Sequence, residues 1–221
     1  GYSSALQENH IVMSHMRGGS LGELLARRET LGARAALRIA IALLSGIGAV
    51  HEGGLVHGGI HPGNILFDEN GEPHLADFGI LRLPSSRVTS FRPLERLHSL
   101  RYAAPELLLG GQASGQSDLY SAAIVIFEML TGQVPSKTRW VPPSELIFPI
   151  PENLDVVLRR ALAPAAEQRH ANAAEFSAVL EAIEAAMGPE YDVAATAQAQ
   201  QLVGHLCDVQ LGHTEQLDLE R

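Results

Sequence analysis

The chain has 221 residues, a hydrophobic content of 46% and a formal net charge of −9 at pH 7. This composition lies outside the range of disordered chains and supplies enough apolar side chains for one globular core. With 25 acidic against 16 basic side chains, there is no electrostatic basis for binding nucleic acid or an anionic membrane surface. Neither is predicted as a partner.

The expected cellular compartment follows from the cysteine content and from the absence of targeting signals in the sequence. A single cysteine, Cys207, excludes an intrachain disulfide. The sequence shows no signal-like segment, and we expect no apolar run of membrane-spanning length. These features predict a reducing, cytoplasmic setting. The first residues are Gly1-Tyr2, without a methionine, as in a piece of a longer protein.

The first half of the chain predicts strand, link, helix, helix and hairpin. Residues 11–13 form a short apolar run, residues 17–20 a glycine-rich link, and a helix is expected from Leu21. From Leu37, apolar positions at helical spacing predict a long buried helix that stops at Gly53-Gly54. Residues 64–67 and 73–76 predict two short strands around an Asn-Gly turn.

The second half predicts a long loop and then helices. Residues 77–106 are polar and irregular, which is typical of a regulatory loop. Helices are expected over 117–130, 154–162 and 176–187, the last with Asn172 and Glu175 spaced as a cap pair. Residues 190–221 have weaker periodicity and can form one modestly amphipathic helix. The chain is therefore predicted to be mainly helical.

Several motifs occur in a defined order. Residues 57–64 read His-Gly-Gly-Ile-His-Pro-Gly-Asn, and Asp-Phe-Gly follows at 77–79. Residues 102–106 read Tyr-Ala-Ala-Pro-Glu, Asp118 precedes an apolar helix, and Arg169 comes late. This order resembles the C-terminal lobe (C-lobe) of the protein kinase family, with its catalytic loop H-R-D-L-K-P-x-N, its metal-binding D-F-G and its A-P-E.

The resemblance implies a mainly α, kinase-like C-lobe with a few short strands, namely a hinge strand at Ile11 and the small hairpin. The N-terminal lobe (N-lobe) is expected to be largely absent, because no glycine-rich loop precedes Ile11. Residues 1–189 are predicted to form the kinase-like domain, and residues 190–221 a C-terminal tail.

The catalytic loop departs from the family pattern at two positions. Where the family has the aspartate that accepts the substrate proton and the lysine that steadies the transferred group, this chain has Gly59 and His61. Loss of a positioned general base costs about 10²–10⁴ in rate. The degenerate loop with His57, Gly59 and His61 therefore predicts no catalytic residue, and the chain is predicted not to be an enzyme but a pseudokinase.

Little or no nucleotide binding, and no cofactor, is predicted without the N-lobe. As an alternative, Asn64 and Asp77 retain the oxygen ligands of a weak Mg²⁺-ATP site, although the same residues can serve only to shape the loop. A zinc site of His57, His61, His74 and Asp77 is disfavoured, because the resemblance points His57 into the interior and His61 toward the cleft.

The resemblance also assigns architectural roles. His57 and Phe78 match the two C-lobe members of the regulatory spine, and Asp118 matches its anchor. Glu106 and Arg169 match the ion pair beneath the activation segment.

The expected function follows from these losses and retentions. Ile11, Met13 and Met16 are predicted to form an apolar surface for a protein partner, a second copy or the tail. We expect a catalytically inactive interaction or regulatory scaffold. The alternative is a degenerate kinase or nucleotide-binding switch whose N-lobe comes from upstream residues or from a partner.

Overall fold

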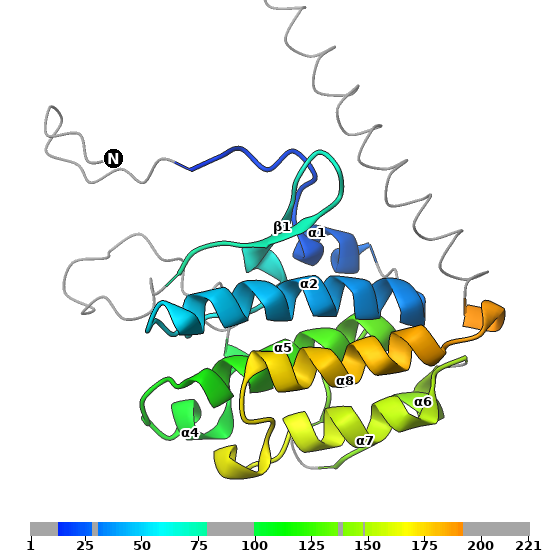
Figure 1. Ribbon diagram of the computed structural model, residues 1–221. Helices are drawn as coiled ribbons and strands as arrows, with labels where there is room; N and C mark the ends of the chain where they lie inside the picture. Colours follow the sequence, from blue (N-terminus) through cyan, green and yellow to red (C-terminus); the bar gives the residue numbers. More distant parts are fainter. Residues whose placement is uncertain (1–12, 28–30, 79–99, 137–138, 148, 192–221) are drawn as a thin grey trace, which may run out of the picture.

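The structure is a computed structural model that describes residues 13–27, 31–78, 100–136, 139–147 and 149–191 (Figure 1). Helices dominate this part of the chain, as predicted, and its only sheet has two strands. In chain order the elements are α1 (Leu21–Ala26), α2 (Ala33–Glu52), η2 (Pro62–Asn64), β1 (Ile65–Phe67), β2 (Pro73–Leu75), α4 (Pro105–Leu108), α5 (Gly115–Thr131), α6 (Pro143–Leu146), α7 (Glu152–Ala161), η4 (Ala166–Gln168), α8 (Ala173–Ala186) and η5 (Pro189–Tyr191).

Helix α2 packs against both α5 and α8 (Figure 1). Its side chains Leu37, Leu44 and Ile47 are almost completely buried and recur at helical spacing. The helix begins four residues before the predicted start at Leu37, because Ala33 and Ala36 extend the same buried face. It ends at Glu52, directly before the predicted glycine stop.

The expectation of no membrane-length apolar segment needs correction. Helix α2 has 20 residues and is apolar enough to cross a membrane by length and composition alone. Its buried residues contribute to the main hydrophobic core, and the helix packs against α5 and α8. We therefore interpret α2 as the core helix of the domain.

Helix α5 lies at the centre of the helical body, and nearly all of its side chains are buried. Ser114 and Ser117 form a capping box at its start, and Gly132 ends it in a left-handed conformation with φ 71°. At the start of α8, the side chain of Asn172 accepts a hydrogen bond from Glu175 N, as the predicted cap requires.

The hairpin lies on the opposite side of α2 from α8 (Figure 1). β1 and β2 are antiparallel, with Ile65 opposite Leu75. Asp68 Oδ1 shapes the turn by accepting hydrogen bonds from Asn70 N (2.8 Å) and Glu72 N (2.9 Å). The link before α1 joins the hairpin, because Gly18 N donates to Phe67 O at 2.9 Å. The hairpin also contacts α1 through β1 and α2 through β2.

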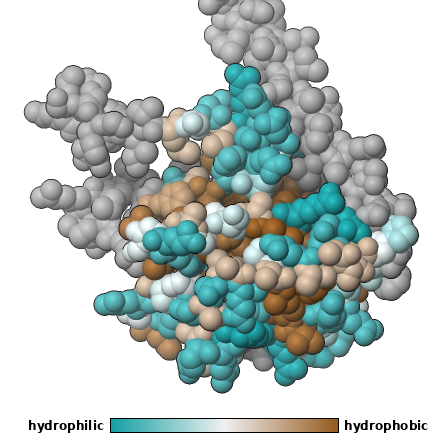
Figure 2. Space-filling model, viewed as in Figure 1, coloured by the Kyte–Doolittle hydropathy of each residue, from teal (hydrophilic) through white to brown (hydrophobic). Residues whose placement is uncertain are grey.

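Three predicted segments fall wholly or partly outside the described residues. Ile11 and Val12 of the expected hinge strand are not described, and Met13 belongs to no strand. The predicted loop is described only at its two ends, and its second end enters α4 at Pro105. Of the tail, only the start is described, in η5. Figure 2 shows hydrophilic residues over the hairpin turn and hydrophobic patches on the helical body.

Candidate functional site

The loop of residues 57–64 rests on one buried carboxylate. Asp118, at the start of α5, is 1% exposed. Its Oδ2 accepts hydrogen bonds from His57 N (2.8 Å) and lies 2.9 Å from His51 Nε2, while its Oδ1 accepts from Gly58 N (2.8 Å). Gly58 has φ 70°, a conformation that favours glycine. The start of the loop is therefore fixed to the central helix.

His57 joins this loop to the Asp-Phe-Gly segment. Its Nδ1 accepts a hydrogen bond from Gly59 N (3.2 Å), so Nε2 carries the hydrogen and donates it to Ala76 O (2.8 Å). Burial lowers the pKa of His57, against smaller raising effects of the Ala76 carbonyl and Asp118, and favours the neutral ring. The ring lies 4.9 Å from that of Phe78, centroid to centroid. The structure thus brings His57, Phe78 and Asp118 together.

Asp77 is an exposed carboxylate on a strained backbone. With φ 61°, it is the only residue other than glycine with a positive φ in the described part of the chain. The preceding residue is held on both sides, because Ala76 N donates to Asn64 O (2.8 Å) and Ala76 O accepts from His57. Such strain persists only where the surroundings impose it, and it concentrates at functional sites.

Asn64 lies on the same loop, and its amide has a defined orientation. Nδ2 donates to Gly59 O at 2.9 Å, which leaves Oδ1 as the atom able to accept or to bind a cation. A carboxylate and an amide oxygen are ligands that suit Mg²⁺. The residues at positions 64 and 77 therefore fit the metal that the kinase family uses.

The two altered positions of the loop have different surroundings. Gly59 provides only backbone atoms, and its carbonyl holds Asn64. His61 is half-buried, and its Nδ1 accepts a hydrogen bond from Gly63 N at 3.1 Å. Its ring lies 6.2 Å from that of Tyr102, in the segment that enters α4.

The segment that enters α4 is tied to the helical body by an ion pair. Arg169 donates to both carboxylate oxygens of Glu106, at 2.7 and 2.8 Å, and its side chain is fully buried. The guanidinium also donates to the carbonyls of Ala163, Pro164 and Gln116. The hydrogen bonds from Arg169 lower the pKa of Glu106. The two residues therefore form a bidentate pair in a satisfied polar network.

The zinc site that the sequence left as a minor alternative does not form. No group of three or more His, Cys, Asp or Glu side chains suitable for a metal occurs within the described residues. His57 is committed to the Ala76 carbonyl, and His74 lies at the exposed hairpin beside Asp68 (3.4 Å). The histidines therefore serve different parts of the fold.

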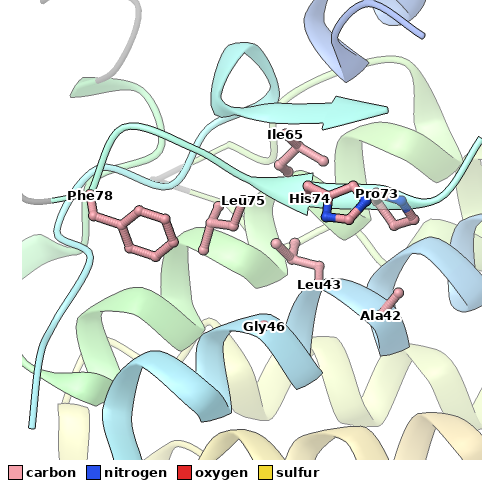
Figure 3. A pocket seen from close by; sticks show the side chains of 8 residues that line it. All are labelled: Ala42, Leu43, Gly46, Ile65, Pro73, His74, Leu75 and Phe78. Atoms are coloured by element: carbon pink, nitrogen blue, oxygen red, sulfur yellow. The ribbon is translucent and has the colours of Figure 1, made fainter. Parts of the chain in front are cut away.

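A pocket that was not predicted from the sequence lies between α2 and the hairpin. This pocket has a volume of about 170 Å³ and is lined by Ala42, Leu43, Gly46, Ile65, Pro73, His74, Leu75 and Phe78. Figure 3 shows Phe78 at one end of it and Gly46 on α2 below. No local pattern in the sequence indicates this pocket, in which a Cβ on Gly46 would meet nothing within 4 Å.

The predicted interaction surface is described only in part. Met13 is 52% exposed, Met16 is half-buried, and Ile11 lies outside the described residues.

Three features define the C-lobe of a protein kinase: a loop anchored on a buried aspartate, an exposed Asp next to a Phe whose ring lies against the loop histidine, and a Glu–Arg ion pair. A family model described as protein kinase domain matches residues 2–188. The chain belongs to the protein kinase family.

Individual relatives agree with this assignment. The serine/threonine-protein kinase PknL of Mycobacterium tuberculosis is 32% identical over 206 residues, which covers 86% of this chain and 51% of PknL. A probable serine/threonine-protein kinase PknB of Bifidobacterium longum is 31% identical and covers 76% of this chain and 26% of PknB. The crystal structure of the PknI kinase domain of Mycobacterium tuberculosis superposes with a TM-score of 0.62 at 28% identity, covering 78% of this chain and 64% of that one.

These relatives correct the prediction that the chain is not an enzyme. They are named as serine/threonine protein kinases and match this chain over most of its length, which points to an enzyme. The changes at Gly59 and His61 alone were insufficient grounds for assigning loss of catalysis. The chain spans about half the length of PknL and less of PknB.

Proposed function

We propose that the chain is the C-lobe of a slow serine/threonine protein kinase, which binds Mg²⁺-ATP through Asn64 and Asp77 and works with an N-lobe outside the described residues. The observation that carries the proposal is Asp77, an exposed carboxylate held at φ 61° while the residue before it is fixed from two sides. Backbone strain of this kind concentrates at functional sites, which supports a role for Asp77 beyond shaping the loop.

Phosphoryl transfer tolerates the loss of the loop carboxylate better than most reactions do. Its transition state is loose, so catalysis depends mainly on positioning and on stabilising charge on the phosphate oxygens. A missing general base costs about 10²–10⁴ in rate, while enzymes accelerate reactions by about 10⁶ or more. With glycine at position 59, the proton of the attacking hydroxyl passes to water or to a phosphoryl oxygen. The remaining activity is slow but measurable.

Each residue of the site has a defined part in this proposal. Asn64 Oδ1 and the Asp77 carboxylate hold Mg²⁺, which when bound neutralises charge on the phosphate oxygens. Asp118 and His57 keep the loop and the Asp-Phe-Gly segment in register, through the contacts to His57 N, Gly58 N and Ala76 O. In this proposal, binding of Mg²⁺ and positioning of the loop do not depend on the side chain at position 59, where glycine supplies no proton acceptor.

Phosphate transfer from radiolabelled ATP to a generic Ser/Thr substrate tests the proposal on the whole gene product that contains this chain. Gly59→Asp should raise kcat by about 10²–10⁴ with little change in KM for ATP, because it restores the acceptor alone. Asp77→Ala should abolish transfer. Glu69→Ala, which removes an exposed carboxylate from the hairpin turn, is the control and should change neither constant. Absence of transfer in both the natural protein and Gly59→Asp would contradict the proposal.

Nucleotide binding is tested separately by thermal unfolding. Millimolar Mg²⁺-ATP should raise the unfolding midpoint, since a ligand that binds only the folded state stabilises it. Asp77→Ala should lose this rise, and Glu69→Ala should keep it. An equal rise in all three proteins would place the nucleotide away from Asp77.

A further inference from the structure

The pocket between α2 and the hairpin leaves apolar side chains uncovered. Its volume is about 170 Å³, and His74 is the only polar residue among those that line it. Phe78 borders one end of the pocket and is 47% exposed, although its ring also contacts His57 (Figure 3). On the α2 side, Ala42 and Gly46 have a small side chain or none, which keeps the pocket open. A concave and mostly apolar surface is typical of a binding site.

The C-terminal end of α8 is fixed to the start of α2. Arg34 Nη1 donates to Glu184 O at 3.1 Å, and Arg34 Nη2 donates to Met187 O at 2.8 Å. Tyr191, the last described residue, is half-buried and packs against the hydrophobic core. The chain therefore leaves the helical body close to the first turn of the helix that also lines the pocket.

The tail that follows, residues 192–221, lies outside the described residues, but its length can be compared with the distance to the pocket. Gly46 lies about 18 Å along α2 from Arg34, at about 1.5 Å per residue, and passing to the hairpin side of the helix adds about 10 Å. Residues 192–205 can span up to about 46 Å when extended. A side chain at position 206 can therefore reach the pocket.

The sequence of the tail provides an apolar side chain at that position. Leu202, Leu206 and Val209 recur at helical spacing, and Leu206 is the middle one of the three. Apolar positions spaced in this way typically anchor a segment in a hydrophobic groove. Because the tail is tethered to the body, it meets the pocket at an effective concentration of about millimolar, which favours it over a separate molecule.

We propose that Leu206 docks in the pocket between α2 and the hairpin, so that the chain's own tail covers Phe78. Phe78 directly follows Asp77, and its ring lies against His57. A docked tail would therefore hold the Asp-Phe-Gly segment from the side that the helical body leaves open. The inference concerns packing within the chain and requires no nucleotide, so it is independent of the proposed function.

Disulfide formation with Cys207 tests this inference, because Cys207 is the only cysteine among the 221 residues and directly follows Leu206. His74→Cys places a second thiol at the pocket. Val156→Cys places one at an exposed position of α7, across the helical body from the hairpin (Figure 1).

Both variants of the whole gene product are equilibrated with reduced and oxidised glutathione, and the disulfide-linked peptides are quantified by mass spectrometry. A disulfide requires Cα atoms within about 7 Å of each other. The disulfide of Cys207 with position 74 should therefore have an equilibrium constant at least about tenfold larger than the disulfide with position 156.

Two further substitutions in the His74→Cys protein show whether the pocket and Leu206 are responsible. Gly46→Leu places a side chain in space where a Cβ would meet nothing within 4 Å, and leucine suits a helix. It should lower the yield of the disulfide to that of the Val156→Cys control. Leu206→Asp should do the same, whereas Gln200→Asp, on the opposite side of the helical pattern, should not. Unfolding midpoints show whether each variant is folded.

The dependence on protein concentration identifies the occupant of the pocket. Docking within one chain predicts a cross-linked monomer with the same yield at every concentration, because the tether sets the effective concentration. A covalent dimer whose yield rises with concentration would overturn the inference in favour of a second copy. Equal yields at positions 74 and 156, or an unchanged yield in Leu206→Asp, would show that Leu206 does not direct the tail to the pocket and would also overturn it. Mg²⁺-ATP binding is measured separately, so these outcomes leave the proposed function untouched.

Discussion

The helical body and the loop region differ in how far their charged side chains are exposed to solvent. In the body, Asp118 and Arg169 are almost fully buried and hydrogen-bonded on all sides. In the loop region, Asp77 and Phe78 are exposed and the strands have three residues each. The body determines whether the chain folds, and the loop determines what the folded chain can do. Changes at Gly59 and His61 can therefore alter the chemistry without removing the chain from its family.

The largest effect is expected from removing the cation of the body. Arg169→Ala deletes the hydrogen bonds to Glu106 and to three carbonyls, and it removes the guanidinium stacked 4.8 Å from the Tyr120 ring. Breaking a buried pair costs about 3–5 kcal/mol, so we expect the free energy of unfolding to fall by about 4 kcal/mol in denaturant titrations. Arg159→Ala, at an exposed position of α7, should change it by less than about 0.5 kcal/mol. A loss below about 1 kcal/mol would mean that the pair behaves like one on the surface.

A somewhat smaller effect is expected where the body meets the loop. Asp118→Asn keeps the shape of the side chain but places an NH₂ group where a carboxylate oxygen accepted hydrogen bonds. One buried backbone N–H then loses its acceptor, which costs about 2–3 kcal/mol in the free energy of unfolding. The exposed Glu52→Gln is the matched control. If both variants unfold at the same denaturant concentration, the loop does not depend on this carboxylate.

A change in the loop region should act mainly locally. A Cβ on Gly18 would lie 2.6 Å from Phe67 Cβ and 2.7 Å from Asp68 O. Gly18→Ala should therefore push the link off the hairpin at a cost of about 1–3 kcal/mol, with faster amide exchange in β1. Gly46→Ala is the same substitution in open space within α2, and it should stabilise the protein by about 0.5–1 kcal/mol. If amide exchange in β1 changed equally in Gly18→Ala and Gly46→Ala, the close contact at Gly18 would not explain the effect.

The smallest effect is a pH dependence within the body. Burial and, next, Arg160 lower the pKa of His170, whose ring stacks on Phe176 at 4.4 Å. A lowered pKa favours the neutral ring in the folded state, so stability is full above the unfolded pKa of about 6.5 and falls as the pH drops below it. Buried His57 acts in the same direction.

Denaturant titrations at pH 7.5 and 5.5 check this. His170 and His57 should each lower the free energy of unfolding by about 1 kcal/mol between pH 7.5 and pH 5.5. The drop in this free energy should therefore be about half as large in His170→Leu as in the natural protein. Glu106, Glu175 and Glu184 have lowered pKa values and lose their contributions only at more acidic pH. His15→Leu, at an exposed position, is the control. An unchanged pH dependence in His170→Leu would show that this ring does not titrate differently on unfolding.

Much of the helical body was predictable from the sequence, and less of the site was. Apolar spacing located α2, α5, α7 and α8, because burial imposes that period. The start of α2 was missed, although Ala33 and Ala36 continue its buried face, because the small side chain of alanine gives a weaker apolar signal than leucine or isoleucine. The motif order placed Asp118 beneath the loop and Arg169 beside Glu106, which are pairs far apart in sequence that only the family resemblance could join.

The conformation of the site itself was not available from the sequence. The sequence at 61–63 does not show that the His61 ring lies over Gly63. The hydrogen bond from Gly63 N to His61 Nδ1 depends on the backbone turn at the start of η2. The prediction of lost catalysis rested on Gly59, His61 and the missing N-lobe, whereas the relatives are named as serine/threonine protein kinases and point to an enzyme. The pocket beneath the hairpin depends on the distance between α2 and β2, which no local pattern encodes.

The left-handed backbone at Asp77 sets protein stability against function. Glycine adopts φ 61° without penalty, so Asp77→Gly should relieve strain of about 1 kcal/mol and raise the unfolding midpoint. A selection for thermostability alone would therefore favour the variant that lacks the proposed metal ligand. We therefore expect that variants selected for thermostability alone, without an assay for nucleotide binding, will often carry a substitution at position 77.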